Sequence, residues 1–232
     1  MLISMGVDLG RSGHTAIVVV GGENWHLRIL HMERLDSITS PEVETLLMRA
    51  YASYNPQVII VERNGPGGVF SEYLAVRNPG IPIIAPDMSH PPVDLELWGE
   101  TQFIPDEYLN IRAEMYFIVH YLLKHRRLKF SHEDSELFAQ LSATEWEFDR
   151  TKAEKIKIKS KKGMKIHDSS SELEDMDFSR SPDKADGLAL ACLGYALIAS
   201  NEALDTGEQV NDVIQPISDG LFNIGGIDLE EL

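Results

Sequence analysis

The sequence predicts an α/β fold in which a central mixed sheet is flanked by helices on both faces. Apolar runs of strand length alternate along the chain with segments whose apolar residues recur at helical spacing. Some of these runs are apolar at every position, as in strands that are covered on both sides. The chain has 232 residues, of which 43% are hydrophobic, and this is enough to bury the core of one ordinary globular domain.

The first strands are expected to form a three-stranded meander. Residues 2–7 are an apolar run that ends at Asp8, and residues 15–20 are a strongly β-branched run that follows a turn-like glycine segment. Two glycines separate this second run from a third strand at residues 25–31.

Helices and strands alternate in the remainder of the chain. Residues 41–54 have apolar positions at helical spacing, with Ser40 as the expected N-cap and a proline in the first turn. Residues 57–61 are an expected strand, apolar from Val58 onward, that ends at Glu62, before a loop rich in glycine. The further expected elements are a helix at 69–76, a strand at 81–85, an irregular segment at 87–106, helices at 109–123 and 135–141, a hairpin of strands 145–148 and 155–158, a loop at 160–180, and a last helix that opens at Ser181 and Pro182.

Composition limits the possible classes of protein. The single cysteine, Cys192, excludes an internal disulfide and a cysteine-based zinc site. The longest apolar run, residues 188–199, is shorter than the roughly 20 residues that cross a bilayer. The first residues lack the basic region of a secretory signal, so a cytoplasmic protein is expected. We expect residues 1–200 to form one domain and residues 201–232 an acidic C-terminal tail.

The formal net charge of −16 argues against tight binding to nucleic acid by this chain alone. Positive charge is nevertheless concentrated in residues 124–129 and 152–165, whereas residues 133–147, 172–177 and those after Asp205 hold much of the negative charge. A local basic track on an acidic body is expected to bind DNA weakly and to need a second component that holds the DNA.

Four carboxylates form the candidate site. Asp8 and Glu62 each end an apolar strand, so they meet at one edge of the sheet if the two strands are neighbours. Asp183 and Asp186 are three residues apart in the first turn of a helix and therefore share a face. Such a cluster is strongly repulsive without cations, and hard divalent ions prefer oxygen ligands.

This arrangement suits hydrolysis of phosphodiester bonds with two Mg²⁺ or Mn²⁺ ions. Asp8 would bridge both ions, Glu62 would hold one, and Asp183, with or without Asp186, would hold the other. Each acid alone also has a purely structural explanation, because Asp often ends a strand and acidic residues favour helix N-termini. The joint occurrence favours the metal site.

Three segments carry a family resemblance: VDLG at residues 7–10, IIVERNGPGG at 59–68 and SPDKADGLALA at 181–191. In this order they resemble the nuclease domain of the large terminase subunit of tailed bacteriophages and, more distantly, Holliday-junction resolvases. The resemblance covers roughly residues 1–200 and implies an RNase H-like fold and a metal-dependent endonuclease that cuts concatemeric viral DNA during packaging. The implied partners are double-stranded DNA, a packaging motor ATPase, the portal and the small terminase subunit. No G-x-x-x-x-G-K-[ST] segment occurs, so the ATPase is not expected within this sequence.

The chain departs from the family pattern at three places. Lys159 precedes Ser160 where the family commonly has an acidic residue, and a long insert through residues 168–179 precedes the last motif. Gly187 stands where alanine is usual, which costs up to about 1 kcal/mol of helix preference. These departures affect details of the substrate loop and leave the proposed ligands unchanged.

Basic residues near the proposed ligands are candidate DNA contacts. Arg11 and Lys184 flank the acids, with a simple salt bridge as the alternative role. His14 is the histidine closest in sequence to Asp8 and so the one expected to reach the site. The remaining candidates, for which a solvated charge run is the alternative, are Lys159, Lys161, Lys162 and Lys165.

The sequence also allows two other functions. VDLGRSG at residues 7–13 also resembles the first phosphate loop of sugar-kinase and actin-type nucleotide phosphotransferases, although the chain is short for that class and Glu62 would have no role in it. A packaging or scaffold module that keeps the fold without catalysis is the third possibility.

Overall fold

The computed structural model describes residues 1–10, 14–36, 39–93, 107–130, 134–152, 154–159 and 183–204. Its centre is a six-stranded mixed sheet with the strand order β5-β4-β1-β2-β3-β6, and a separate hairpin joins β7 to β8. The strands are β1 (Leu2–Leu9), β2 (His14–Glu23), β3 (His26–Asp36), β4 (Val58–Val61), β5 (Ile83–Ile84), β6 (Leu128–Lys129), β7 (Trp146–Asp149) and β8 (Lys155–Ile158). The helices are α1 (Ser40–Tyr54), α2 (Pro66–Arg77), α3 (Ile111–Lys124), α4 (Ser135–Ala143) and α5 (Asp183–Leu204).

The predicted meander is confirmed. Strands β1, β2 and β3 pair in antiparallel fashion, β4 and β5 extend the sheet in parallel with β1, and β6 adds to β3 in parallel. Strand β6 has only two residues and was not predicted, because so short a pairing leaves no alternation in the sequence.

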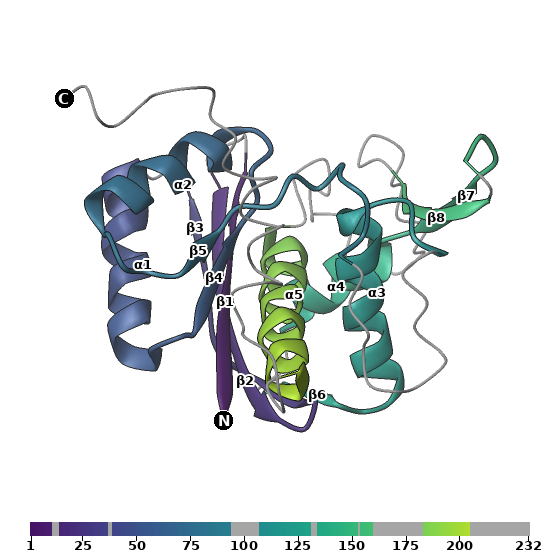
Figure 1. Ribbon diagram of the computed structural model, residues 1–232, viewed down its shortest axis with the longest axis horizontal. Coiled ribbons are helices and arrows are strands. Elements are labelled where there is room, and N and C mark those ends of the chain that lie inside the picture. The colour runs from purple at the N-terminus through teal and green to yellow at the C-terminus, as the bar shows by residue number, and fades with distance from the viewer. Residues whose placement is uncertain are drawn as a thin grey trace.

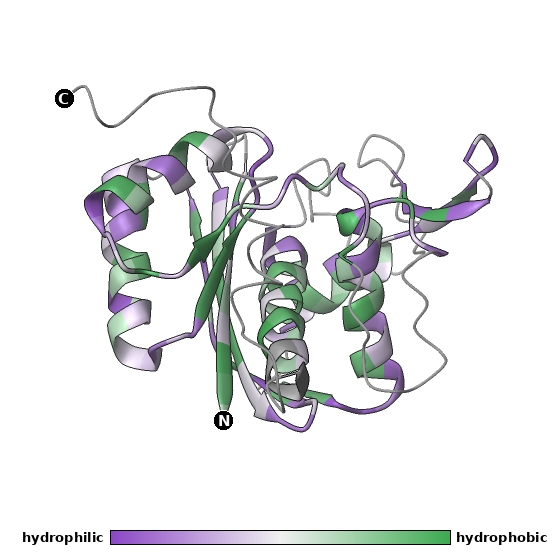
Figure 2. Ribbon diagram, in the orientation of Figure 1, coloured by the Kyte–Doolittle hydropathy of each residue, from purple (hydrophilic) through white to green (hydrophobic). Residues whose placement is uncertain are grey.

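Helices cover both faces of the sheet, as the sequence predicts. Figure 1 shows α1 and α2 on one side and α5, α3 and α4 on the other. A hydrophobic core lies on each face of the sheet, and alternate residues of the central strands point into one or the other. In β2, Ile17 and Val19 pack with the α1 and α2 layer, whereas Val18 and Val20 pack with the α3 and α5 layer. In Figure 2 the strands and the inner sides of the helices are accordingly hydrophobic.

The start of α1 differs in detail from the expectation. The N-cap is Thr39 and not Ser40, because the Glu42 carboxylate accepts hydrogen bonds from the Thr39 amide at 2.7 Å and from its hydroxyl at 2.8 Å. Thr39 and Glu42 form a capping box, in which the Glu42 carboxylate satisfies the backbone amide of the N-cap residue.

Helix α5 packs unusually close to β1 and β2. A Cβ atom on Gly6 would come within 2.2 Å of the Gly187 carbonyl oxygen, so a side chain there would not fit. Two residues away on the same face of β1, the Ser4 hydroxyl donates to the Ala191 carbonyl at 2.5 Å. A Cβ on Gly187 would lie 3.0 Å from Val18 Cγ2, so the glycine at this position is explained by packing against the sheet.

The β7–β8 hairpin is confirmed, with register pairs from Trp146–Ile158 to Asp149–Lys155. The expected loop at 160–180, with Ser181 and Pro182, lies outside the described residues, as does most of the expected tail, so the domain boundary at residue 200 stays a prediction. None of the described helices combines the length and apolarity needed to cross a membrane.

Candidate functional site

The carboxyl ends of β1 and β4 lie side by side. The two strands are parallel neighbours with Val7 opposite Val61, so Asp8 and Glu62 follow at adjacent positions, as predicted. The Glu62 amide donates to the Val7 carbonyl at 3.4 Å and extends this pairing by one residue. Asp8 has only 4% of its surface exposed, although the Asp side chain is rarely buried in proteins.

The first turn of α5 reaches the same edge of the sheet. Helix α5 runs antiparallel to β1, with Ala191 beside Ser4, Gly187 beside Gly6, and Asp183 beside Gly10. A Cβ on Gly10 would lie 3.1 Å from Asp183 Oδ1, so the absence of a side chain there lets the carboxylate approach the end of β1. Because alternate residues share a face, Asp8 points toward α5 like its neighbours two residues away.

Asp186 is buried and firmly held. Its Oδ1 accepts a hydrogen bond from Arg112 Nη2 at 2.9 Å and another from the Tyr116 hydroxyl at 2.6 Å. The Asn110 side chain caps α3 by accepting from the Ala113 amide at 3.0 Å, and this cap places Arg112 in the first turn of α3. Arg112 therefore reaches Asp186 from a neighbouring helix.

Arg112 also acts on the strand-end acids. Burial alone would lower its pKa, but the charge of Asp186, followed by Tyr116, Glu62 and Asp8, raises the pKa of Arg112 well above its ordinary value. The pKa of Tyr116 is likewise raised, first by burial and then by the charge of Asp186. One guanidinium thus lowers the mutual repulsion of three carboxylates.

A second arginine faces Asp183. Arg34 Nε lies 3.9 Å from Asp183 Oδ2, and the same guanidinium pairs with Glu136 and, at 3.4 Å, with Asp36. The strand register explains this position, because Asp8 pairs with Ala16 and Ala16 pairs with Arg34. These residues form one row across the sheet, in which the small alanine separates the acid from the base.

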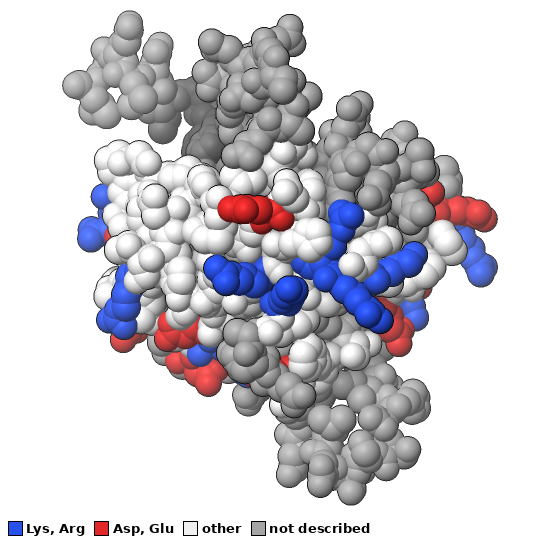
Figure 3. Space-filling model, turned by 90° about the horizontal axis from the view of Figure 1, so that it is seen from below, with Lys and Arg blue, Asp and Glu red and all other residues white. Residues whose placement is uncertain are grey.

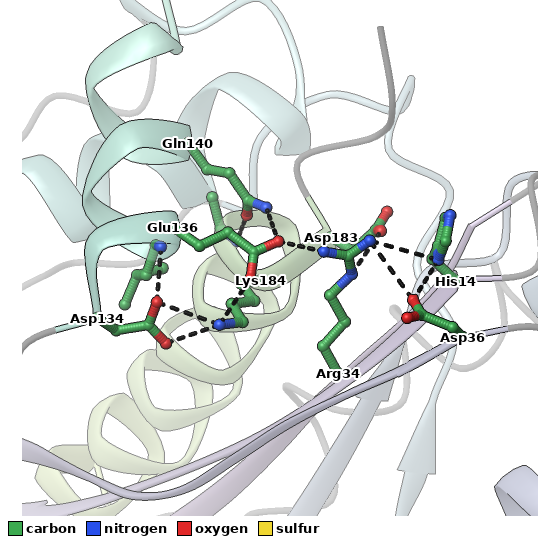
Figure 4. A network of polar contacts seen from close by, with 10 residues as sticks. His14, Arg34, Asp36, Asp134, Glu136, Gln140, Asp183 and Lys184 are labelled. Atoms are coloured by element: carbon green, nitrogen blue, oxygen red, sulfur yellow. Dashed lines mark hydrogen bonds and ion pairs between the residues drawn. The ribbon is translucent and has the colours of Figure 1, made fainter. Parts of the chain in front are cut away.

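The network around Arg34 continues to Lys184 (Figure 4). Lys184 Nζ lies 2.8 Å from Asp134 Oδ2 and 2.8 Å from Glu136 Oε2. Burial alone would lower the pKa of Lys184, but hydrogen bonds to Asp134 and Glu136 raise it. The Gln140 side-chain oxygen accepts from the Ala185 amide at 3.0 Å, so α4 supplies both an ion pair and a cap to the start of α5.

Other predicted contact residues are placed as follows. The side chain of Lys159 is 41% exposed and pairs with Glu145 at 2.6 Å, beyond the end of β8. His14 opens β2, and its Nδ1 lies 2.5 Å from Asp36 Oδ1, which connects it to the site through Arg34. The candidates that lie outside the described residues are Arg11, Lys161, Lys162 and Lys165.

The donor set suits a hard divalent cation, because it consists of carboxylate oxygens that are largely withdrawn from water. Within the part of the chain that the structure describes, no group of three or more His, Cys, Asp or Glu side chains is spaced to hold a metal ion as it stands. The two arginines provide part of the positive charge that the cluster needs.

Sequence reasoning missed Arg34, Arg112 and Tyr116. Arg34 could be recognised only from the register that aligns it with Asp8 across β2. Arg112 and Tyr116 stand four residues apart on one face of α3, at the spacing of an ordinary amphipathic helix. Nothing in that spacing indicates that the face is directed at Asp186.

The sheet order and its two helical layers define an RNase H-like fold, as the resemblance implied. Among solved structures, the chain is similar to the nuclease domain of the large terminase subunit gp2 of bacterial virus Sf6, with 15% sequence identity, a TM-score of 0.63, and coverage of 83% of this chain and 88% of that one. It is also similar to the large terminase nuclease from thermophilic phage G20c, with 12% identity, a TM-score of 0.53, and coverage of 82% and 80%.

Structures of these two nucleases exist with manganese for Sf6 and with bound magnesium for G20c. No family model matches the present sequence, and no curated protein matches it. The likeness is therefore one of fold, maintained at low sequence identity.

Proposed function

We propose that this protein is a metal-dependent DNA endonuclease with its active site at the carboxyl ends of β1 and β4, and that it cuts concatemeric viral DNA during genome packaging. The observation that carries the proposal is the meeting of Asp8, Glu62 and the first turn of α5 at one edge of the sheet. The fold shared with terminase nuclease domains supports this class of reaction.

Asp8, Glu62 and Asp183 are the proposed inner ligands. Asp186 was also predicted as a ligand, but its bonds to Arg112 and Tyr116 favour an outer role in which it fixes Arg112 beside the strand-end acids. Two Mg²⁺ or Mn²⁺ ions, when bound, would activate the attacking water and stabilise the leaving oxygen. The protein's own contribution is to hold the carboxylates on a rigid sheet edge and to offset their repulsion with Arg34 and Arg112.

The proposed DNA contacts are of two kinds. Lys159 lies on the surface and is proposed to contact phosphate, together with Arg11, Lys161, Lys162 and Lys165. Lys184 is held between Asp134 and Glu136, which favours a positioning role for α5 over direct contact with DNA.

The net charge of −16 supports a division of labour. Because phosphate contacts supply most non-specific affinity for DNA, an acidic nuclease needs another component to hold its substrate. We propose that a packaging motor ATPase, on another chain or on a part of the protein outside this sequence, acts with the portal and the small terminase subunit to deliver double-stranded DNA to this site in the host cytoplasm.

A plasmid-nicking assay tests the proposal. Supercoiled DNA is incubated with the protein and Mn²⁺, Mg²⁺, Ca²⁺ or chelator. Asp8→Asn, Glu62→Gln and Asp183→Asn should each lower nicking at least 100-fold, and Asp186→Asn should lower it less. The matched control is Glu44→Gln, which removes a carboxylate bound by Arg77 in the opposite helical layer and should leave nicking unchanged.

Three outcomes would contradict the proposal. Equal nicking by the wild-type protein and the three ligand variants would show that the site is wrong. Absence of cleavage with every metal, at high protein concentration, would instead favour a non-catalytic packaging module. ATP hydrolysis that survives loss of Glu62 would favour the nucleotide phosphotransferase.

A further inference from the structure

A cluster of basic residues lies at the end of the sheet opposite to the carboxylates. We call this cluster the basic face. Its members come from the start of β3, the end of α3, the turn after α3, and β6: Arg28, Lys124, Arg126, Arg127 and Lys129. Figure 3 views this end of the molecule and shows Lys and Arg gathered at its centre.

Backbone pairing brings these residues together. Arg28 is paired with Lys129 where β6 joins β3, and the neighbouring Leu27 amide donates to the Arg127 carbonyl at 2.7 Å. Arg126 lies in the turn between α3 and β6, with a positive φ of 55°. All members are exposed except Arg127, which is half-buried with its guanidinium 5.9 Å from the centre of the Tyr121 ring.

The basic face is separate from the candidate active site. Arg28 and Arg34 stand six residues apart on β3, a distance of about 20 Å along an extended strand. One phosphate cannot contact both ends. Glu23, which lies at the same end as the basic face, pairs with the amino group of Met1 at 3.0 Å. Among the described residues, no carboxylate lies within ion-pair distance of Arg28, Lys124, Arg126 or Lys129.

Helix α5 leads the chain directly to this end of the molecule. The Tyr195 ring packs against Trp25 in the turn before β3, with ring centres 5.4 Å apart, and α5 then continues to Leu204. In Figure 1 the last turns of α5 lie at the same end of the molecule as β6. Leu204, the last residue of α5, therefore lies at the same end of the molecule as the basic face.

The segment that follows has the complementary charge. Residues 205–232 contain seven Asp and Glu residues and no Lys or Arg. Twenty-eight residues can extend up to about 90 Å, so every member of the basic face is within reach. Tethering gives such a segment an effective concentration on the order of millimolar near its attachment point.

We propose that the basic face is the docking surface for the acidic segment 205–232 of the same chain. The carboxylates of the segment occupy the cations of this face and thereby exclude the phosphates of nucleic acid from it. The isolated protein consequently binds DNA more weakly than its exposed lysines and arginines would allow. This inference does not depend on the nuclease proposal, because it concerns the other end of the sheet.

Zero-length carbodiimide crosslinking of the full chain tests the contact directly. The reagent joins amines to carboxylates that touch, and mass spectrometry identifies the joined residues. Crosslinks from Lys124 or Lys129 to the acids of segment 205–232 are expected within single chains at low salt, and they should disappear at 1 M salt. Lys152 on the exposed hairpin turn is the internal control and should not crosslink to the segment. Absence of crosslinks to the basic face, or crosslinks found only between two chains, would overturn the proposal.

DNA binding in EDTA provides the second measurement. The full-length variant with all seven acids of the segment changed to Asn or Gln should bind a short duplex at least tenfold more tightly at 50 mM salt. The slope of log affinity against log salt should become steeper by about 3 to 4, as expected for three or four new phosphate contacts. An unchanged affinity would overturn the proposal.

A matched pair of further variants localises the effect. In the neutralised background, changing Arg28, Lys124, Arg126 and Lys129 to Gln should remove the gain in affinity. The control set removes positive charge from exposed residues elsewhere and should keep most of the gain: Arg49, Arg77 and Arg150. Equal losses from the two sets would show that net charge alone governs DNA binding and would contradict docking on the basic face. Both DNA-binding measurements are made without divalent metal, so they do not depend on nuclease activity. Their failure is therefore distinguishable from failure of the nuclease proposal.

Discussion

Replacing Arg112 by methionine should destabilise the protein strongly and should make its stability depend more on divalent metal. Methionine keeps most of the side-chain volume and removes the guanidinium that lies 2.9 Å from Asp186. Asp186 is completely buried, and the same guanidinium offsets the charges of Glu62 and Asp8. The substitution therefore leaves a buried carboxylate cluster without one of its internal cations.

The size of the effect follows from the burial of the pair. Removing one partner of a buried ion pair typically costs about 3 to 5 kcal/mol, because the other charge is left uncompensated. For a domain of this size, each kcal/mol lowers Tm by about 2 to 4 °C, so a fall of about 6 to 20 °C is expected. Divalent metal that binds the folded carboxylates should restore part of this loss through mass action.

Thermal unfolding of wild-type and variant protein in EDTA and in 5 mM Mn²⁺ is the assay. Arg77→Met is the matched control, because Arg77 lies at a similar distance of 3.0 Å from Glu44 but its side chain is 57% exposed. Exposed pairs contribute little to stability, so Arg77→Met should shift Tm only slightly and equally with and without metal. The reasoning is refuted if Arg112→Met behaves like Arg77→Met, or if Mn²⁺ raises Tm no more in Arg112→Met than in the wild type.

Three further predictions concern the surroundings of the site. Tyr116→Phe should cost about 2 kcal/mol in urea unfolding, because it removes a buried hydrogen bond of 2.6 Å to the Asp186 carboxylate; an unchanged midpoint would contradict this contact. Gly6→Ala should cost about 3 kcal/mol or prevent folding, since its Cβ would lie 2.2 Å from the Gly187 oxygen, and wild-type stability would disprove the close packing. Burial raises the pKa of Cys192 to about 12, so its thiol should react with a disulfide reagent at pH 8 only after unfolding, and rapid reaction of the native protein would exclude this placement.

The order of strands and helices could be predicted because several apolar strands end at an acidic residue. Asp8 and Glu62 each interrupt an apolar run, and the parallel neighbours β1 and β4 bring them together in the expected way. The final helix was recognisable from its apolar stripe, and its first turn meets the same sheet edge. Periodicity and strand ends therefore sufficed to bring Asp8, Glu62 and Asp183 to one edge of the sheet, and their role as metal ligands stays a prediction.

The basic part of the site could not be predicted, because it depends on register and on packing between distant elements. Arg34 reaches Asp183 only because β3 pairs with β2 so that Ala16 stands between Arg34 and Asp8. Arg112 reaches Asp186 across the contact between α3 and α5, 74 residues apart in the sequence. The short strand β6 was missed for the same reason. Its pairing with β3 is a contact between distant segments and leaves no alternating pattern of apolar residues in the sequence.

The central claim is that the carboxyl ends of β1 and β4, with the start of α5, hold divalent metal for DNA cleavage. A crystal structure of the wild-type protein soaked in Mn²⁺, with anomalous difference maps recorded, tests this claim most directly. We predict two anomalous peaks among the carboxylates of Asp8, Glu62 and Asp183, with Asp186 still bound to Arg112. No peak at this sheet edge under saturating Mn²⁺, or peaks only elsewhere on the protein, would contradict the claim.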